Sequence, residues 1–141
     1  MSESVITAFK FLYEVLDKSN LDKLSSVYAD SILFEDPFHR IEGLKELTEY
    51  FEGMYQNVVS VDFDFGEVSE GNHQFHINWV MTLTHPKLNK GKAYPVSGCS
   101  FIRFDEQGLI THHRDYFDGG EMIYEQLPVI RKLVRIVKKQ M

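Results

Sequence analysis

Residues 101–118 read FIRFDEQGLITHHRDYFD, and this stretch decides the fold of the 141-residue chain. Apolar and polar side chains alternate on both sides of a turn at residues 105–108, which ends on glycine. Alternation with a period of two is typical of strands that bury one face, and a short connection that ends in glycine is typical of a β-hairpin. The stretch therefore predicts two antiparallel strands, at 94–104 and 109–118.

The same alternation continues upstream of the hairpin. Residues 58–65 and 75–83 carry apolar side chains at every second position, and a turn at 70–72 separates them. A short apolar run at 32–36 predicts one more strand, which ends at Pro37 because proline has no amide hydrogen to donate. These strands follow one another through short turns, which favours an antiparallel sheet.

Helical periodicity replaces the alternation in the other parts of the chain. Apolar residues recur three and four positions apart in residues 5–16, 21–28 and 44–55, and again in 128–141. This spacing predicts three helices before the long run of strands and one helix after it. Such an order is typical of an α+β domain in which a curved sheet wraps over helices.

Composition and charge exclude several classes of protein. Hydrophobic residues make up 43% of the chain, which excludes a disordered protein, and the net charge of -6 argues against nucleic-acid binding. A single cysteine, Cys99, excludes an internal disulfide and is typical of a reducing compartment. Residues 1–11 lack the basic flank and apolar run of a signal peptide, and no stretch approaches the roughly 20 apolar residues of a membrane span. We therefore expect a soluble, cytoplasmic, single domain.

Two stretches resemble a known superfamily: YADSILFEDPFHRIEG, residues 28–43, and the hairpin of residues 101–118. Both are similar to the nuclear transport factor 2-like superfamily, in its SnoaL-like branch, and the similarity covers nearly the whole chain up to Asp118. The resemblance implies a cone, in which a strongly curved antiparallel sheet closes over three amino-terminal helices and leaves a pocket at the wide end. We expect this cone domain over residues 1–126, with a basic amphipathic helix at 127–141 packed on it or extending from it.

The resemblance points to several activities, because the superfamily includes ketosteroid isomerases, polyketide cyclases, limonene-epoxide hydrolases, scytalone dehydratase and many binding or accessory domains. Asp36, which precedes a proline, matches the general base of the isomerases. Their oxyanion-hole residues fall on Leu12 and Ser100, which donate a hydrogen bond weakly or not at all. Asp115 falls on a catalytic carboxylate of the epoxide hydrolases and near that of the cyclases. Residues 75–83 lack the Arg-x-Asp pair that the hydrolases need.

Alternation along the last strand predicts which side chains face the pocket. If Asp115 points into the cone, then Thr111, His113 and Phe117 do so too, while the residues between them point outward. The predicted pocket is apolar with a few polar groups, which is typical of a small-molecule site. Its expected lining residues are Tyr13, Phe38, Phe63, Trp79, Ser100, Ile102 and Phe117.

A carboxylate beside an imidazole suits proton transfer, because histidine exchanges a proton near neutral pH and an aspartate fixes its tautomer. We therefore expect Asp36, His113 and Asp115 to be catalytic, with the aspartates transferring protons, and Ser100 to be a polar anchor. Three simpler interpretations stay open: turn chemistry at Asp36, a structural ion pair of Asp115 with an arginine, and a hydrogen-bonded core position for His113. No spacing of histidines predicts a metal site, and we expect no cofactor.

These residues predict binding of a small hydrophobic molecule, such as a polyketide, lipid or terpenoid. In the first interpretation, the protein also catalyses a cofactor-free acid/base reaction of the isomerase, cyclase or dehydratase type on that molecule. The alternative is a non-catalytic ligand-binding or accessory protein. The residues alone leave both alternatives open.

Two surfaces predict contacts with partners. Cys99, Phe101 and Tyr116 give the outer face of the sheet an apolar character, which predicts a homodimer through that face. The helix at 127–141 combines an apolar face with five basic residues. This combination predicts either a lid over the pocket or a peripheral contact with an anionic membrane.

Overall fold

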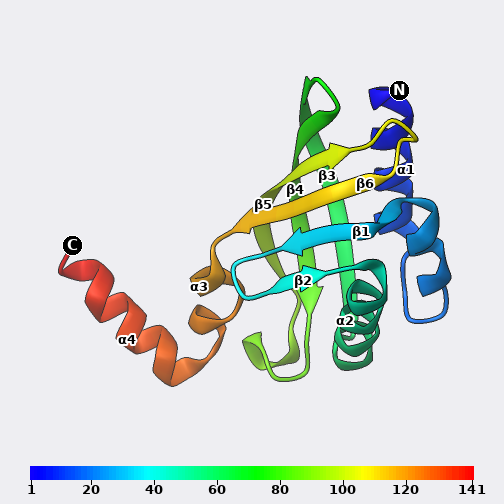
Figure 1. Ribbon diagram of the computed structural model, residues 1–141. Helices are drawn as coiled ribbons and strands as arrows, with labels where there is room; N and C mark the ends of the chain where they lie inside the picture. The colour runs from blue at the N-terminus through cyan, green and yellow to red at the C-terminus, as the bar shows by residue number, and fades with distance from the viewer.

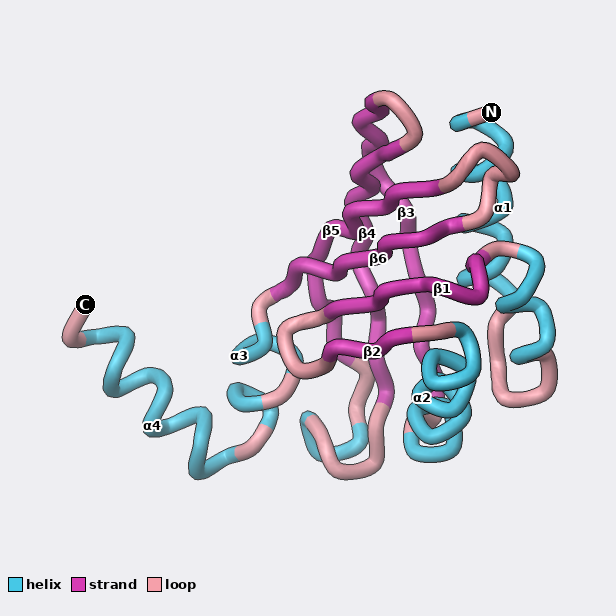
Figure 2. Tube along the Cα trace, in the orientation of Figure 1, coloured by secondary structure: helices cyan, strands magenta, loops and turns pink.

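A strongly bent six-stranded sheet forms the body of the computed structural model, which describes residues 1–141 (Figure 1). The strand order is β2-β1-β6-β5-β4-β3. The strands are β1 (Tyr28–Glu35), β2 (Arg40–Glu42), β3 (Ser60–Gly71), β4 (Gln74–Thr84), β5 (Tyr94–Phe104) and β6 (Ile110–Phe117). In Figure 2 the strands turn from nearly horizontal β1 and β6 to nearly vertical β3 and β4, so the sheet has a concave side.

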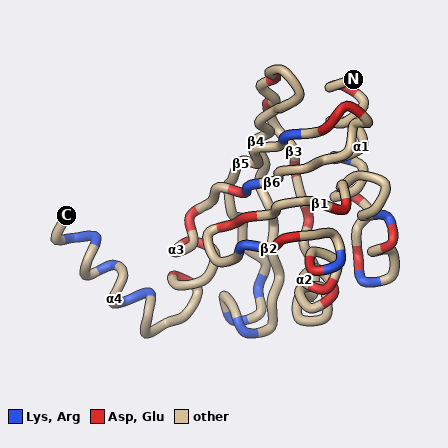
Figure 3. The backbone as a smooth tube through the Cα atoms, in the orientation of Figure 1, with Lys and Arg blue, Asp and Glu red and all other residues tan.

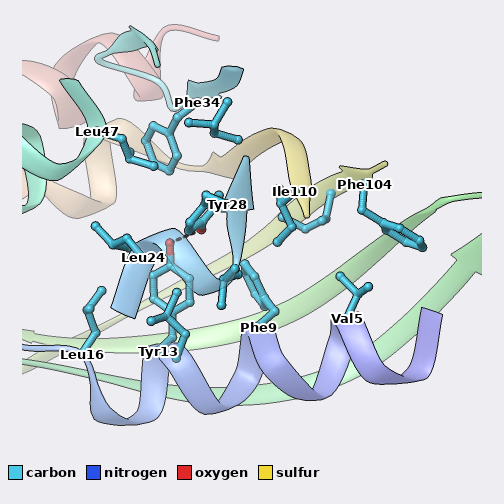
Figure 4. Packing of buried hydrophobic residues seen from close by; sticks show 14 of the residues in the cluster. Val5, Phe9, Tyr13, Leu16, Leu24, Tyr28, Phe34, Leu47, Phe104 and Ile110 are labelled. Carbon is cyan, nitrogen blue, oxygen red and sulfur yellow. Dashed lines mark hydrogen bonds between the residues drawn. The ribbon is translucent and has the colours of Figure 1, made fainter. Parts of the chain in front are cut away.

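Helices before β3 pack on the concave side and build the core. They are α1 (Ser2–Val15), the 3-10 helix η1 (Leu21–Ser26) and α2 (Leu44–Asn57). Helix α1 buries one stripe of side chains at three- and four-residue spacing: Val5, Phe9, Leu12 and Tyr13. Figure 4 shows Val5, Phe9 and Tyr13 of this stripe facing Tyr28 from β1 and Ile110 from β6, with Phe34 beside Leu47 at the far side of the same cluster. The α+β cone expected from the sequence is therefore confirmed.

One pair of strands runs in an unexpected direction. Strands β3 to β6 pair with their sequence neighbours in antiparallel fashion, and β2 pairs with β1 in the same way. Strand β1, however, pairs with β6 in parallel. Side chains alternate with the same period in parallel and antiparallel strands, so the sequence pattern carried no signal for this pair.

Tyr28 lies in a strand, whereas the periodicity predicted a helix over residues 21–28. The 3-10 helix η1 ends at Ser26, two residues before the predicted helix would end. The amide of Ile110 then donates to the carbonyl of Val27 at 2.9 Å, and the pairing of β1 with β6 begins there. As a result, Tyr28 is buried in the core.

Thr111 does not point into the cone as the alternation predicted, because a β-bulge in β6 changes its orientation. Ile110 pairs with Phe104 and His112 pairs with Arg103, so Thr111 is the extra residue on the bulged strand. The bulge turns Ile110 into the core, and the Thr111 side chain contacts the Arg103 carbonyl instead. After the bulge, the predicted alternation holds from His112 to Phe117.

The segment after β6 leaves the sheet and ends in an outlying helix. Its elements are α3 (Gly119–Met122), η3 (Tyr124–Gln126) and α4 (Pro128–Lys139). The one remaining helical element of the chain, η2 (Asn89–Gly91), lies elsewhere, in the loop between β4 and β5. Helix α4 projects away from the body (Figure 1), and none of its residues is buried. No helix combines the length and the apolar content that a bilayer-spanning helix needs.

Candidate functional site

A cavity with two chambers opens on the concave side, between α2, β4 and α3. The inner chamber has a volume of about 60 Å³ and is lined by 14 residues, of which 12 are hydrophobic. The two exceptions are Asp36 and Asp115. An outer chamber of about 460 Å³ shares Tyr50, Met81 and Phe117 with the inner one. Two carboxylates therefore line an otherwise hydrophobic inner chamber, and the outer chamber adds the polar side chains of His39, Glu49, Asn57 and His85.

Asp115 is held by hydrogen bonds through one of its two carboxylate oxygens. Ser100, which faces Asp115 in the β5–β6 ladder, donates its hydroxyl to Oδ1 at 2.5 Å. The Nε2 atom of His113 lies 2.6 Å from the same oxygen, and the Trp79 indole N–H donates to Ser100 Oγ at 2.9 Å. No hydrogen bond ends on Oδ2, and no side-chain oxygen or nitrogen is both buried and without a partner. Oδ2 is therefore open toward the cavity that Asp115 lines.

The network continues from His113 into the core. The Tyr28 hydroxyl lies 2.8 Å from His113 Nδ1, and the Tyr13 hydroxyl lies 2.6 Å from that of Tyr28. The His113 ring is also enclosed by aromatic side chains, including Phe34 with ring centroids 4.7 Å apart. The network thus reaches from α1 and β1 to the cavity wall.

Donor and acceptor counting fixes the direction of these bonds. An ionised Asp115 accepts only, so His113 donates from Nε2. Nδ1 of the neutral ring then accepts from Tyr28, and the Tyr28 oxygen accepts from Tyr13. A protonated ring would donate from Nδ1 to Tyr28 and leave one of the two tyrosine hydrogens without an acceptor. The neutral ring with its hydrogen on Nε2 therefore satisfies every group in the network.

The tyrosine hydroxyls at the site remain protonated. Burial raises the pKa of Tyr13 and of Tyr28 well above the ordinary value, and the negative charge of Asp115 adds to the rise in both. Burial also raises the pKa of Tyr50, followed by the effect of neighbouring Asp36. All three hydroxyls are thus neutral hydrogen-bond donors at neutral pH.

Asp36 sits at the junction of the two chambers, in a turn that its own side chain stabilises. Its Oδ1 accepts from the backbone amides of Phe38 and His39 at 2.8 and 2.7 Å, and His39 Nδ1 lies 3.0 Å away. The Tyr50 hydroxyl donates to Oδ2 at 3.2 Å. These are the contacts expected of turn chemistry, and they engage both oxygens of Asp36, in contrast to Asp115.

Most of the predicted lining residues contact the cavity. Tyr13, Phe63 and Trp79 line the inner chamber, Phe38 lines the outer one, and Phe117 lines both. Two predicted residues do not line either chamber: Ser100 lies behind Trp79 and Asp115 as their hydrogen-bond partner, and Ile102 lies in the closed core.

Three tyrosines of the site were not predicted: Tyr28 in the hydrogen-bond network, and Tyr50 and Tyr55 in the inner lining. Tyr50 lies three residues after Leu47 and four before Met54, and this helical spacing indicates the cavity-facing side of α2. Tyr28 was hidden because the sequence suggested a helix there. No group of three or more His, Cys, Asp or Glu side chains is arranged to hold a metal ion. His112, next to buried His113, points to the opposite, exposed face.

Comparisons with known proteins agree with this architecture. The model of the SnoaL-like domain family matches residues 10–113. No curated protein matches the chain. Solved structures with the same fold include an NTF2-like protein of unknown function from Burkholderia pseudomallei K96243, which has 16% sequence identity and a TM-score of 0.74 and aligns over 84% of this chain and 94% of its own.

Two further structures have names that mention an activity or a bound molecule. One is an LEH-like epoxide hydrolase from M. tuberculosis, with 21% identity, a TM-score of 0.70 and coverage of 96% of both chains. The other is a protein with a ketosteroid isomerase-like fold from Catenulispora acidiphila, solved in complex with trimethylamine. It has 14% identity and a TM-score of 0.73, and covers 86% of this chain and 90% of its own. At these identities, the similarity establishes the fold.

Proposed function

The chain belongs to the SnoaL-like domain family, and from this premise we propose that it binds a small apolar molecule in the two-chamber cavity and moves a proton of that molecule with Asp115. The observation that carries the proposal is the asymmetry of the Asp115 carboxylate. Oδ1 is held by Ser100 and His113, while Oδ2 accepts no hydrogen bond in an inner chamber whose lining is hydrophobic apart from Asp36 and Asp115. A carboxylate fixed in this way is a suitable base for an acidic C–H bond.

The proposed reaction needs only the carboxylate. Oδ2 takes a proton from a carbon next to a carbonyl group, and the electron pair of the C–H bond moves into an enolate. The resulting carboxylic acid then returns the proton to another carbon, which shifts the double bond. The Tyr50 hydroxyl lines both chambers and donates a long 3.2 Å bond to Asp36. Tyr50 is therefore our candidate donor to the developing oxygen charge.

Charge limits the class of ligand. Asp36 and Asp115 line the inner chamber, Glu49 joins the outer one, and neither lining includes a lysine or an arginine. An anionic ligand would bring a third or fourth negative charge into a region of low dielectric constant. We therefore propose an uncharged ligand, such as a terpenoid or polyketide ketone or alcohol.

Hydrogen–deuterium exchange tests the proposed chemistry. Isophorone and β-decalone, two neutral ketones with acidic C–H bonds, are incubated with the protein in D₂O and followed by NMR. We expect exchange that Asp115→Asn lowers by about 100-fold or more, while the matched control Asp62→Asn, on an exposed position of β3, leaves it unchanged. Binding of the neutral dye Nile red checks that the cavity of each variant is intact. Equal exchange by Asp115→Asn and the unaltered protein contradicts the assignment of Asp115.

A non-catalytic binding protein is the second candidate. It is favoured by the observation that the polar hydrogens of Tyr13, Tyr50 and Trp79, which line the cavity, already have acceptors within the protein. An enolate oxygen that bonds to Tyr13, Tyr50 or Trp79 would have to displace the acceptor that the donor already has. If both ketones displace bound Nile red, but neither ketone exchanges hydrogen for deuterium, the result supports ligand binding and contradicts catalysis.

The outer face of the sheet is our proposed homodimer interface. Tyr116 is half exposed there, with the Arg114 guanidinium 4.9 Å from its ring, and Phe101 stacks on His76 with ring centroids 4.7 Å apart. Flat aromatic and arginine side chains are typical of the centres of protein interfaces. Light scattering of the unaltered protein and of Tyr116→Asp tests this. A dimer mass that the substitution halves supports the interface, and a monomer mass for the unaltered protein contradicts it.

A further inference from the structure

Helix α4 separates apolar and basic side chains completely. A helix turns by about 100° per residue, so the apolar residues of this segment span an arc of about 160° and the basic residues span about 120° on the opposite side. The apolar arc consists of Val129, Ile130, Leu133, Val134, Ile136, Val137 and Met141. The basic arc consists of Arg131, Lys132, Arg135, Lys138 and Lys139. Figure 3 shows these cations along α4, and no acidic residue lies among them.

The apolar arc is not covered by the rest of the chain. Leu133 is 57% exposed, Val137 is 59% exposed and Val129 is 74% exposed. The helix is held mainly at η3, where Lys138 Nζ lies 2.6 Å from a carboxylate oxygen of Glu125. Figure 1 shows the remainder projecting away from the sheet and from α2. The apolar arc therefore needs a partner from outside.

The helix is also too short to be stable in water by itself. Isolated helices of fewer than about 12–15 residues are marginal, because few hydrogen bonds offset the cost of nucleation. No side chain caps the amino terminus of α4, and its first turn contains no acidic residue. An apolar surface that covers the arc would supply the missing stabilisation.

The basic residues of α4 indicate which kind of surface would cover the apolar arc. Cations flank the apolar arc on both edges, with Lys132 beside Ile136 on one edge and Lys138 beside Val134 on the other. This is the pattern of helices that lie in a membrane interface, where the apolar arc enters the acyl region and the flanking cations reach phosphate groups. A lid over the cavity mouth would bury the arc but leave the basic arc in water. The rest of the chain is strongly acidic, so α4 is the region that an anionic surface attracts.

We propose that α4 is a membrane-docking helix, which binds reversibly to bilayers that contain anionic phospholipids. Docking would bring the cavity mouth close to the bilayer, because Met122 and Ile123 line the outer chamber and α4 begins a few residues later at Pro128. An apolar ligand would then reach the cavity from the membrane without crossing water. This last step rests on the proposed function, whereas docking itself does not.

Vesicle sedimentation with the full-length chain tests the proposal. We expect the protein to sediment with phosphatidylglycerol-containing vesicles and not with pure phosphatidylcholine vesicles, and added NaCl to weaken binding. Leu133→Asp should abolish sedimentation, while the matched control Phe11→Asp should not, since Phe11 is an equally exposed (57%) side chain on α1. Lys132→Gln combined with Arg135→Gln should lower partitioning by about 25-fold, since each charge near an anionic surface contributes about a factor of five. Lys87→Gln combined with Lys92→Gln, in the loop around η2, is the charge-matched control.

Two results overturn the proposal. One is an absence of sedimentation with anionic vesicles at low salt. The other is a dimer that Leu133→Asp dissociates in the absence of vesicle binding, which assigns the arc to a second copy of the chain. Nile red binding, measured in parallel, separates the two proposals: loss of docking with an intact cavity contradicts only the membrane role, and docking without dye binding contradicts only the proposed function.

Discussion

The Trp79 indole lies directly against the backbone of Gly98, its partner in the β4–β5 ladder. A Cβ atom at residue 98 would lie 2.2 Å from the ring, far inside any contact distance. The absence of a side chain therefore makes room for the indole, which lines the inner chamber and donates its N–H to Ser100. A single glycine on β5 thus shapes a wall of the cavity two residues away from the Asp115 network.

We expect Gly98→Ala to displace the indole and to lower the free energy of unfolding by about 1–3 kcal/mol, as overpacking does in other cores. Trp79 is the one tryptophan of the chain, so its fluorescence reports the displacement directly. The matched control is Gly53→Ala in α2, where nothing lies within 4 Å of the added atom. This control should be stabilised by up to about 1 kcal/mol, because alanine favours a helix. Unchanged fluorescence in Gly98→Ala would contradict the close packing.

The fold followed from the sequence where side-chain periodicity specified it. The hairpin at 101–118 and the apolar stripe of α1 were predicted because burial on one face leaves a clear period. The parallel pairing of β1 with β6 was not, because strand direction depends on contacts between distant segments. The bulge at Thr111 also left no signal, since one extra residue shifts the alternation without changing the composition.

Removal of the Tyr28 hydroxyl should destabilise the protein more than removal of the Tyr13 hydroxyl. Tyr28 bonds to both Tyr13 and His113, so Tyr28→Phe leaves buried His113 Nδ1 without a partner. A buried polar group without a partner costs about 1–3 kcal/mol. Tyr13→Phe removes a terminal donor and should cost about 0.5–1.5 kcal/mol. Urea unfolding of the two single variants and of the double variant measures these losses of unfolding free energy. A larger loss for Tyr13→Phe than for Tyr28→Phe would contradict the direction deduced for the hydrogen bonds.

Stability should decline at alkaline pH because of the buried tyrosines. Burial raises the pKa of Tyr13 and of Tyr28 well above the ordinary value, and raises that of Tyr94 to about 12. In the unfolded chain these hydroxyls ionise near pH 10. Above that pH the folded state therefore binds more protons than the unfolded state, and the free energy of unfolding falls as pH rises.

Denaturant titrations between about pH 8 and pH 12 measure this decline. We expect a level region below about pH 9, and a fall of about 1.4 kcal/mol per pH unit for each fully buried tyrosine well above pH 10. Tyr28→Phe removes one such group, so its profile should be shallower by that amount. Parallel profiles for this variant and the unaltered protein would contradict the burial of the Tyr28 hydroxyl in the folded state.

Asp36 should act mainly through the turn that it stabilises. Asp36→Asn keeps a carbonyl oxygen for the amides of Phe38 and His39, so we expect a loss of less than about 1 kcal/mol. Asp36→Ala removes that acceptor and should cost about 1–2 kcal/mol. Thermal unfolding compares the two variants. The ketone exchange assay provides the second readout: a loss of exchange in Asp36→Asn as large as that in Asp115→Asn would give Asp36 a catalytic role as well.

Residues of the candidate site were identifiable from the sequence, but the contacts that distinguish its two carboxylates were not. Asp36, His113 and Asp115 were singled out from the sequence, and Asp36 and Asp115 line the same cavity. Asp115, unlike Asp36, keeps one oxygen without a hydrogen bond. This difference depends on Ser100, whose position opposite Asp115 follows from strand register. The bulge at Thr111 shifts β6 against β5 and so brings Ser100 opposite Asp115, and no local motif reported that shift.

Ligand charge should determine affinity for the cavity, and two molecules of the same carbon skeleton test this. Geraniol is a neutral alcohol, and geranic acid is an anion at neutral pH. Asp36 and Asp115 line the inner chamber without a compensating lysine or arginine, so the alcohol should displace Nile red with at least about tenfold higher affinity than the acid. Asp115→Asn should narrow this ratio, because it removes one negative charge while it keeps the shape of the side chain. Displacement titrations at neutral pH measure both ratios, and tighter binding of geranic acid to the unaltered protein would refute the assignment of an uncharged ligand.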